Sequence, residues 1–245
     1  YNYQILIEYE GTKYFGWQIQ KKRPTIQGVL QNALRKYFKK KITIFGAGRT
    51  DTGVHACAQS AHFFLDKLIE KKFKFLNTIN FFLKKKDISI LDIKKKKLNF
   101  HSRFNAKKRI YKYYIINRIG DLKLRRKRAW HIKNYLDLNK MKKGAVLLKG
   151  TKDFSTFRSS SCSAKSPIKT LNRVNITKNG NLIEITFVSK SFLQQQVRSM
   201  VGCLKYLGIN KWDLKKFKKV LNSKKRKFCA PPAVSEGLYL LKVNY

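Results

Sequence analysis

The stretch Gly46-Ala47-Gly48-Arg49-Thr50-Asp51-Thr52-Gly53-Val54-His55-Ala56 is the most informative part of the chain. Its three glycines predict a tight polar turn over residues 46–53, because glycine adopts backbone conformations that other residues avoid. A short strand-like run, residues 42–45, precedes the turn, and a longer one, residues 54–65, follows it. We therefore predict a polar turn held between two strands.

The turn places a guanidinium, Arg49, two residues before a carboxylate, Asp51. Glycines on either side allow the backbone to approach a ligand closely, which suits a catalytic carboxylate. A structural interpretation is equally open, since Asp and Thr side chains commonly hydrogen-bond turn backbone and an Arg beside an Asp often forms a plain ion pair. Spacing alone does not decide between the two interpretations.

The flanking elements of the first half follow from apolar periodicity. The side chains of residues 3–9 alternate in the manner of a strand with one buried face. Apolar residues recur every three or four positions over residues 26–38, which predicts a helix that Thr25 caps. A second helix is predicted over residues 66–83 and a strand over 88–93. The first half ends near residue 97.

The second half likewise contains both predicted strands and predicted helices. Its predicted strands are 109–117, 174–177, 182–188 and 238–243, and its predicted helices are 138–148, 192–207 and 212–221. The pair Asn179-Gly180 is typical of a hairpin turn in which both residues have positive φ. The two halves show no identity strong enough to indicate a repeat and no low-complexity linker marks a boundary, so the sequence indicates only mixed helices and strands in both halves.

The chain is strongly basic, with 56 Lys and Arg against 13 Asp and Glu and a formal net charge of +43. Biased coding explains an excess of Lys but not the scarcity of acids. A polyanion would relieve the self-repulsion of such a charge, and nucleic acid is the expected partner.

The cysteines and the lengths of the apolar runs indicate in which cellular compartment the protein is expected. The four cysteines are widely spaced and contain no Cys-x-x-Cys pair, which favours neither a disulfide framework nor a zinc site and fits a reducing cytoplasm. His55 and Cys57 are interpreted as strand residues, since nothing nearby completes a four-ligand metal set. No apolar run reaches the length of a membrane span, and no signal peptide is indicated.

Several further motifs, taken with the turn, identify the chain as similar to the tRNA pseudouridine synthase A family. The turn itself closely resembles the family's signature. The other motifs are Tyr14-Phe15-Gly16-Trp17-Gln18, Thr25-Ile26-Gln27-Gly28, Phe104-Asn105-Ala106 with Arg109-Ile110-Tyr111-Lys112-Tyr113, Phe192-Leu193 with Val197-Arg198-Ser199-Met200-Val201-Gly202, and Pro232-Ala233 with Gly237-Leu238. Their order and spacing agree along nearly the whole chain.

The resemblance implies a fold and a reaction. The expected fold is two similar α+β halves, residues 1–98 and 99–245, whose antiparallel sheets join across a pseudo-two-fold and leave a basic cleft. The expected reaction converts uridine to pseudouridine at positions 38, 39 and 40 of the tRNA anticodon arm. It needs no cofactor and no metal, and the expected enzyme is a cytoplasmic homodimer.

The resemblance also assigns roles to individual residues. Asp51 matches the catalytic nucleophile or base, and Arg198 matches the arginine that pairs with it. Arg49 matches the arginine that helps to flip the base out of the RNA, and Tyr111 the tyrosine that lies against the uracil ring. Without the resemblance, a strand tyrosine is more often a core residue, and a helix arginine more often extends its head to solvent.

Two further features concern the second half of the chain. Gln194, Gln195 and Gln196 stand where relatives usually carry His, Arg or Met, which leaves open how the start of that helix contacts RNA. The Ser-rich residues 159–166 are a candidate for a loop that closes over a ligand, or for an ordinary surface loop.

The alternative functions are a non-catalytic RNA-binding or chaperone protein of the same fold and a zinc-dependent base deaminase. The first would also use the positive charge of the chain. The deaminase requires a His-x-Glu and Pro-Cys-x-x-Cys set, which the sequence lacks.

Overall fold

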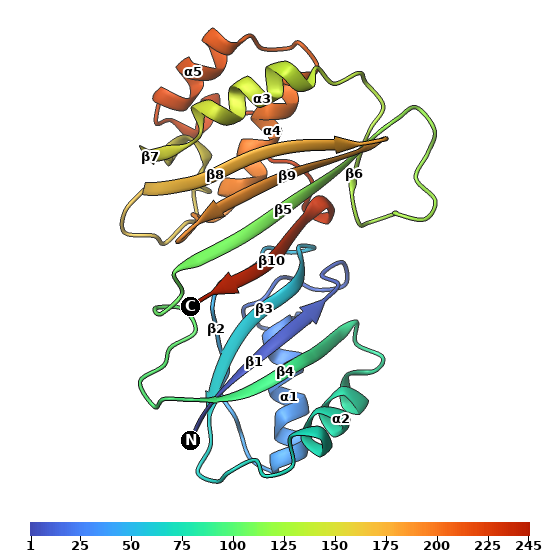
Figure 1. The fold of residues 1–245 in the computed structure, drawn as a ribbon, viewed down its shortest axis with the longest axis vertical. Helices are drawn as coiled ribbons and strands as arrows, with labels where there is room; N and C mark the ends of the chain where they lie inside the picture. Colours follow the sequence, from blue (N-terminus) through green and yellow to red (C-terminus); the bar gives the residue numbers. More distant parts are fainter. The chain divides into compact units, whose positions relative to one another are not determined.

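The computed structural model describes residues 1–245, which form two compact units (Figure 1). The first unit comprises Tyr1–Lys107 and Tyr239–Tyr245, and the second comprises Lys108–Leu238. Each unit combines a mainly antiparallel sheet with helices, which confirms the predicted α+β class.

The sheet of the first unit has the strand order β4-β1-β3-β10, with β2 beside β3. Strand β1 is central and antiparallel to both of its neighbours, whereas β10 runs parallel to β3. The predicted alternation holds in β1, where the side chains of Tyr3, Ile5 and Ile7 are buried. The strands are β1 (Asn2–Tyr9), β2 (Phe45–Gly46), β3 (His55–Phe64), β4 (Ile88–Lys96) and β10 (Leu238–Asn244).

Two helices complete the first unit, α1 (Ile26–Phe38) and α2 (Lys72–Leu83), which lie side by side in Figure 1. Thr25 caps α1 as predicted, since its hydroxyl accepts a hydrogen bond from the Gly28 N–H at 3.3 Å. The ring of Phe75 meets the ring of Tyr37 edge-on, with centroids 5.2 Å apart. Phe75 is fully buried and belongs to the core of the first unit.

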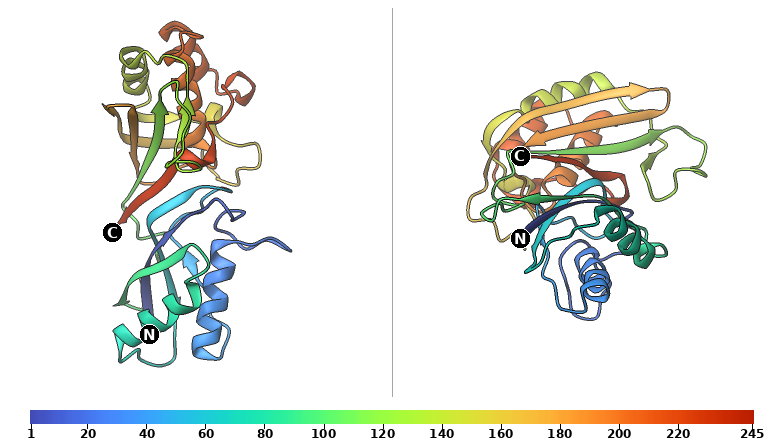
Figure 2. Two further views of the ribbon diagram at one scale, coloured as in Figure 1. Left: turned by 90° about the vertical axis from the view of Figure 1, so that its right-hand side faces the viewer. Right: turned by 60° about the horizontal axis from the view of Figure 1, so that its bottom comes forward.

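The second unit has the strand order β5-β9-β8-β7, with the short β6 parallel to β5. Strands β8 and β9 form a long hairpin, and β5 runs along β9 (Figure 2). The strands are β5 (Lys108–Asn117), β6 (Trp130–Ile132), β7 (Gly150–Asp153), β8 (Ile168–Asn179) and β9 (Leu182–Ser189). Neither β6 nor β7 was predicted, because three or four residues are too few to show a period.

Three α-helices and three short 3-10 helices accompany this sheet. They are α3 (Leu138–Leu147), α4 (Gln196–Gly208), α5 (Leu214–Asn222), η1 (Ser155–Phe157), η2 (Arg226–Phe228) and η3 (Ser235–Gly237). Asp137 and Asp213 cap α3 and α5 by accepting hydrogen bonds from backbone N–H groups. Two of the 13 acids in the chain therefore serve helix ends. No helix is long and apolar enough to cross a membrane.

Several predicted boundaries were wrong, each because a long-range contact replaced a local pattern. Residues 42–44 are not a strand, since the Ile44 backbone is bonded by the Gln27 and Gln31 side chains of α1. Helix α2 begins at Lys72 rather than 66, because the preceding segment is tied elsewhere: the Ile69 N–H donates to the Tyr3 hydroxyl.

Two more corrections concern the second unit. Asn179 is the last paired residue of β8, so the hairpin turn is Gly180-Asn181, and of these only Gly180 has positive φ. Glycine at the first turn position is typical of a type II′ hairpin rather than the predicted turn. Helix α4 begins at Gln196, because Gln195 lies in the left-handed region with φ 60.

His62 on β3 gives the first unit a specific acid sensitivity. Its Nδ1 accepts a hydrogen bond from the Ser102 N–H, and burial lowers its pKa to about 4, with a contribution from His101. The unfolded chain therefore takes up this proton at higher pH than the folded one. We expect the free energy of unfolding to fall between pH 6.5 and pH 4. The free energies of unfolding of the wild type and of His62→Gln, measured in urea, should become more similar as the pH falls. Parallel pH profiles of the two proteins would contradict this.

Candidate active site

The turn that carries Asp51 is fixed by backbone hydrogen bonds at several points. The Ala47 N–H donates to the Ser60 carbonyl of β3 at 2.7 Å, and the Trp17 N–H donates to the Thr50 carbonyl at 3.1 Å. Beyond Asp51, the Gly53 N–H donates to the Tyr14 carbonyl at 3.3 Å. The turn is therefore held between β3 and the segment that follows β1.

Two side chains brace the same turn. The Tyr9 hydroxyl and the Thr50 hydroxyl are 2.8 Å apart, and the Gln59 amide donates to the Gly48 carbonyl at 2.8 Å. Gln59 is completely buried. Neither Tyr9 nor Gln59 was predicted to support the turn, and the sequence signal was limited to a Gln in the middle of a predicted strand.

Gly16 allows the neighbouring backbone to lie against the turn. Its φ is +83, and a Cβ built there would lie 2.5 Å from the Thr50 carbonyl oxygen. We expect Gly16→Ala to lower the free energy of unfolding by roughly 2 kcal/mol or more, since strain and a backbone clash combine. Gly150→Ala is the matched control, because Gly150 has φ +93 but open space around it. Equal decreases in urea unfolding would show that no clash exists at Gly16.

The two charged residues of the turn differ in exposure. Thr50 is buried, Asp51 is half-buried, and Arg49 is exposed. The backbone of Asp51 is also hydrogen-bonded, since its carbonyl accepts from the Val54 N–H at 3.2 Å. The turn thus presents a carboxylate from a fixed backbone, beside a guanidinium that is accessible to a ligand.

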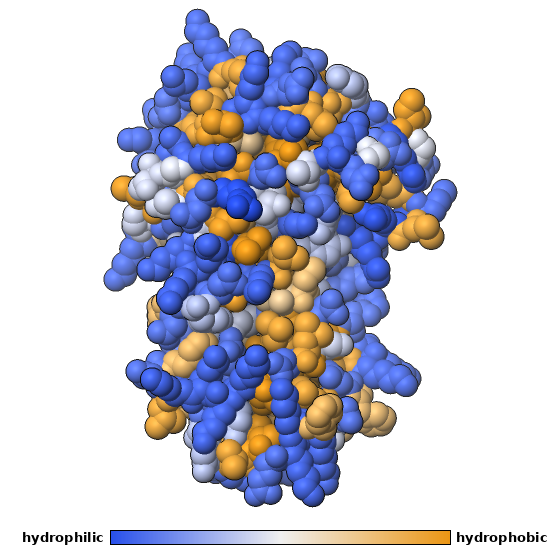
Figure 3. Space-filling view, in the orientation of Figure 1, coloured by the Kyte–Doolittle hydropathy of each residue, from blue (hydrophilic) through white to orange (hydrophobic).

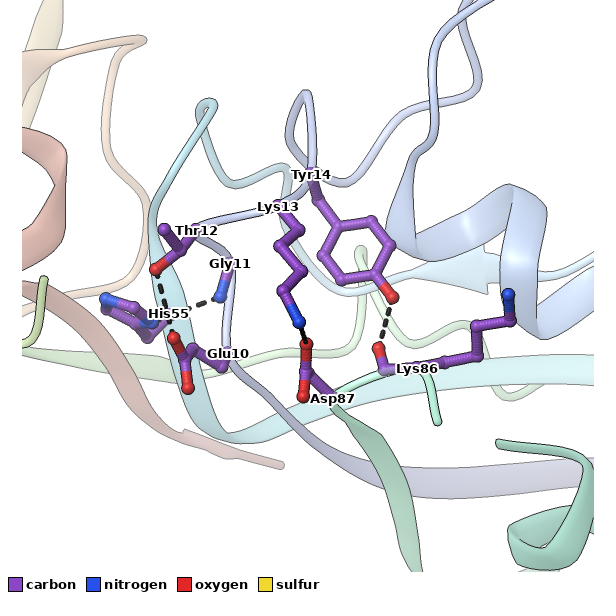
Figure 4. Close-up of polar contacts among 8 residues, drawn as sticks. All are labelled: Glu10, Gly11, Thr12, Lys13, Tyr14, His55, Lys86 and Asp87. Atoms are coloured by element: carbon purple, nitrogen blue, oxygen red, sulfur yellow. Dashed lines mark hydrogen bonds and ion pairs between the residues drawn. The ribbon is translucent and has the colours of Figure 1, made fainter. Parts of the chain in front are cut away.

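The residues that flank the turn have structural partners (Figure 4). His55 accepts a hydrogen bond at Nδ1 from the Gly11 N–H at 3.0 Å, and its ring stacks on Tyr239. The Tyr14 hydroxyl donates to the Lys86 carbonyl, and burial with the nearby Asp87 charge raises its pKa to about 12. His55 is therefore a strand residue that holds the chain, as predicted.

The side chains that commonly bind metals do not form a cluster in this chain. His55 and Cys57 both lie on β3, and no group of three or more His, Cys, Asp and Glu side chains is placed to hold a metal ion.

Tyr111 lies on β5 within the second unit. It pairs with Phe187 of β9, is 7% exposed, and meets Phe192 edge-on at a centroid distance of 5.1 Å. Two residues along the same face, Tyr113 is fully buried and donates to the Val234 carbonyl. Both side chains are buried in the core, Tyr111 slightly less completely than Tyr113.

Arg198 lies in the first turns of α4 and is half-buried. Its Nε donates to the Ala233 carbonyl at 2.7 Å, and the Ala233 N–H donates back to the Arg198 carbonyl at 2.9 Å. Burial raises the pKa of Tyr113 well above its usual value, and the charge of Arg198 opposes this. The Pro232-Ala233 motif thus holds the side chain of Arg198 by its backbone.

The unusual glutamines lie where α4 begins, with Gln194 and Gln195 preceding its first residue, Gln196. Gln196 is buried, and its Oε1 accepts a hydrogen bond from the Leu193 N–H at 2.8 Å. The Gln194 carbonyl accepts from the Ser159 N–H, which ties the helix start to the Ser-rich loop. These glutamines organise the entry into the helix that carries Arg198.

Comparison with known proteins decides the family. Residues 5–105 and 145–245 match the family described as tRNA pseudouridine synthase. The chain belongs to the tRNA pseudouridine synthase family. Both matched segments contain predicted site residues: Arg49 and Asp51 lie in the first, and Arg198 in the second. Tyr111 lies between them.

Curated members of the tRNA pseudouridine synthase family match over almost the full chain. A protein of Pelagibacter ubique named tRNA pseudouridine synthase A is 58% identical over 245 residues, covering 100% of both chains. Proteins of the same name from Maricaulis maris and Afipia carboxidovorans are 40% and 41% identical over 243 residues, covering 99% of this chain and 97% and 99% of their own.

Proposed function

We propose that this protein converts uridine to pseudouridine in tRNA, at positions 38, 39 and 40 of the anticodon stem-loop, with Asp51 as the catalytic carboxylate. The carrying observation is the half-buried Asp51 on a turn that β3, Tyr9 and Gln59 hold in place. Membership of the tRNA pseudouridine synthase family supports the substrate.

The isomerisation breaks the bond from uracil N1 to ribose C1′, turns the base, and joins C5 to C1′. It neither consumes water nor changes the oxidation state, so the proposal includes no cofactor and no metal. An ionised Asp51 would attack C1′, attack C6 of the uracil, or remove a ribose proton. All three routes need the carboxylate to be held in one orientation, and a turn whose backbone is fixed by hydrogen bonds supports this requirement.

Three other residues complete the proposed site. Arg198, held by the Ala233 carbonyl, stabilises the charge of Asp51. Tyr111 presents its ring to the uracil, and its hydroxyl handles the C5 proton. The exposed Arg49 enters the space that the flipped uridine leaves, where a planar guanidinium stacks and contacts phosphate.

The direct test is conversion of tRNA transcripts by the purified protein, with pseudouridine mapped by chemical modification. The proposal predicts product in the anticodon arm from the wild type without added metal or cofactor. An RNA-binding protein of the same fold, the rival function, would retain the transcript and yield no pseudouridine.

Positive charge on the second unit supports RNA binding beyond the catalytic residues. Residues 118–128 form an irregular loop with six basic residues and a single acid, Asp121. Part of the loop lines a hollow of about 440 Å³, and Leu124 is 97% exposed. Hydrophilic side chains also cover most of the face in Figure 3, with apolar patches between them.

Neutralising this loop should weaken tRNA binding without affecting chemistry. The variant Lys123→Gln/Arg125→Gln/Arg126→Gln removes three charges. Affinity falls as salt is added, and each phosphate interaction that the variant abolishes should make the plot of log affinity against log salt less steep by roughly 0.7 to 0.9. We expect higher KM and unchanged kcat. Filter binding over a salt series measures the slope, and Lys215→Gln/Lys218→Gln/Lys219→Gln on α5 is the charge-matched control. An identical effect in both variants would assign no phosphate to the loop.

Two further parts of the proposal concern assembly and setting. We propose a homodimer that acts on the anticodon arm in the cytoplasm, a setting that suits four free cysteines. Light scattering of the purified protein should give twice the chain mass of 28.8 kDa, and a monomer at assay concentration would refute the dimer.

A further inference from the structure

Two cysteines far apart in the sequence meet inside the second unit. Cys203 on α4 is fully buried, and Cys229 directly follows η2 and is half-buried. Their Sγ atoms are 3.5 Å apart without a bond between them. A disulfide has an S–S length of about 2.0 Å, so a modest approach of the two segments would join them.

The two thiols differ in burial and in the direction of their pKa shifts. The Arg226 guanidinium lies 3.5 Å from the Cys229 Sγ. The hydrogen bond between the two thiols and the Arg226 charge lower the pKa of Cys229, whereas the same hydrogen bond and burial raise the pKa of Cys203. Because the thiolate is the reactive form, the more exposed Cys229 is the attacking sulfur and Cys203 the resolving one.

The pair lies next to the residues that hold Arg198. Arg226 also donates to the hydroxyl of Ser199, the neighbour of Arg198, at 2.6 Å. The segment after Cys229 leads to Ala233, whose carbonyl accepts from Arg198 Nε. It packs tightly on α4, since a Cβ on Gly202 would lie 2.1 Å from the Pro231 carbonyl oxygen.

We propose that Cys203 and Cys229 form a peroxide-reactive thiol pair whose oxidation to a disulfide displaces the support of Arg198. The Cys229 thiolate attacks a peroxide oxygen, which forms an S–O bond, breaks the O–O bond and releases hydroxide. The Cys203 sulfur then attacks the Cys229 sulfur, and the S–O bond breaks as the S–S bond forms. The two thiols lose two electrons and two protons, and hydrogen peroxide is reduced to two waters.

The consequence for activity rests on the proposed function and on the role given there to Arg198. Drawing Cys229 towards α4 moves the segment that ends at the Ala233 carbonyl, and a shift of about 1 Å at a catalytic group is costly. We expect kcat on tRNA to fall roughly tenfold or more in the disulfide form, and a thiol reductant to restore it.

The chemical test uses the full-length Cys57→Ser/Cys162→Ser protein, which keeps only the pair. It is treated with hydrogen peroxide, alkylated, and analysed by intact mass and peptide mapping. The proposal predicts a loss of two hydrogen atoms, no alkylation, and one crosslinked peptide containing Cys203 and Cys229. Adding Cys203→Ala should leave Cys229 alkylated or further oxidised without a crosslink. Two thiols that remain fully alkylated after peroxide would overturn the proposal.

Activity is then compared in the reduced, oxidised and re-reduced forms of the same preparation. A reduced form that is active and an oxidised form with unchanged kcat would overturn the effect on Arg198, while leaving the isomerase function intact. A reduced form without activity would instead refute the proposed function, and the crosslink would still report on the thiol pair.

Discussion

Asp51→Asn should convert tRNA at least ~10³-fold more slowly than the wild type, a loss of about 4 kcal/mol of transition-state stabilisation. An amide of the same shape keeps the turn but is neither a nucleophile nor a base at neutral pH. The backbone hydrogen bonds that hold the turn at Ala47, Thr50 and Gly53 remain in this variant, so the fold should persist. Single-turnover conversion at saturating enzyme measures the chemical step alone.

The control for Asp51 is Asp66→Asn. Asp66 also belongs to the first unit, but its exposed side chain pairs with Lys40 on the surface, at 2.6 Å, and such pairs stabilise little. Its conversion rate should equal that of the wild type. If Asp51→Asn binds tRNA and reacts at the rate of Asp66→Asn, then Asp51 is not the catalytic carboxylate.

Arg198→Ala should slow conversion about 100-fold, or roughly 2.7 kcal/mol, because Asp51 would lose the charge partner proposed for it. The effect should fall on kcat more than on KM, since the pairing is proposed to matter in the reaction and not in docking. Lys205→Ala removes a positive charge from the same helix and should have little effect on kcat.

Arg198→Lys separates charge from geometry. A lysine keeps the positive charge but has no Nε to donate to the Ala233 carbonyl, so its ammonium is not fixed in the same way. We expect a rate between those of the wild type and Arg198→Ala. Full activity in Arg198→Ala, measured under single-turnover conditions, would remove Arg198 from the mechanism.

Local signals made much of the fold predictable. The cap at Thr25, the alternation of β1 and the helix α3 depend on neighbouring residues, and each was placed within a few positions. The turn with Asp51 was recognisable for the same reason, because its glycines, charges and motif are contiguous. Contiguous patterns are visible in a sequence, and here the structure keeps them.

Contacts between distant residues were not predictable in the same way. Nothing near Gly48 in the sequence indicates that Gln59 holds its carbonyl, and nothing near Arg198 indicates Ala233 as its acceptor. The false strand at residues 42–44 has the same cause, since helix side chains take the hydrogen bonds that a strand would have supplied. Each of these depends on which segments the fold brings together.

The most direct test of the central claim is a nucleotide-resolution map of pseudouridine in one tRNA transcript that carries uridine at positions 38, 39 and 40 as well as in its other arms. Wild-type protein should place product in the anticodon arm alone, and Asp51→Asn should leave the whole transcript unmodified. Product outside that arm would refute specificity for the anticodon arm, and the same map from both proteins would refute Asp51 as the catalytic carboxylate.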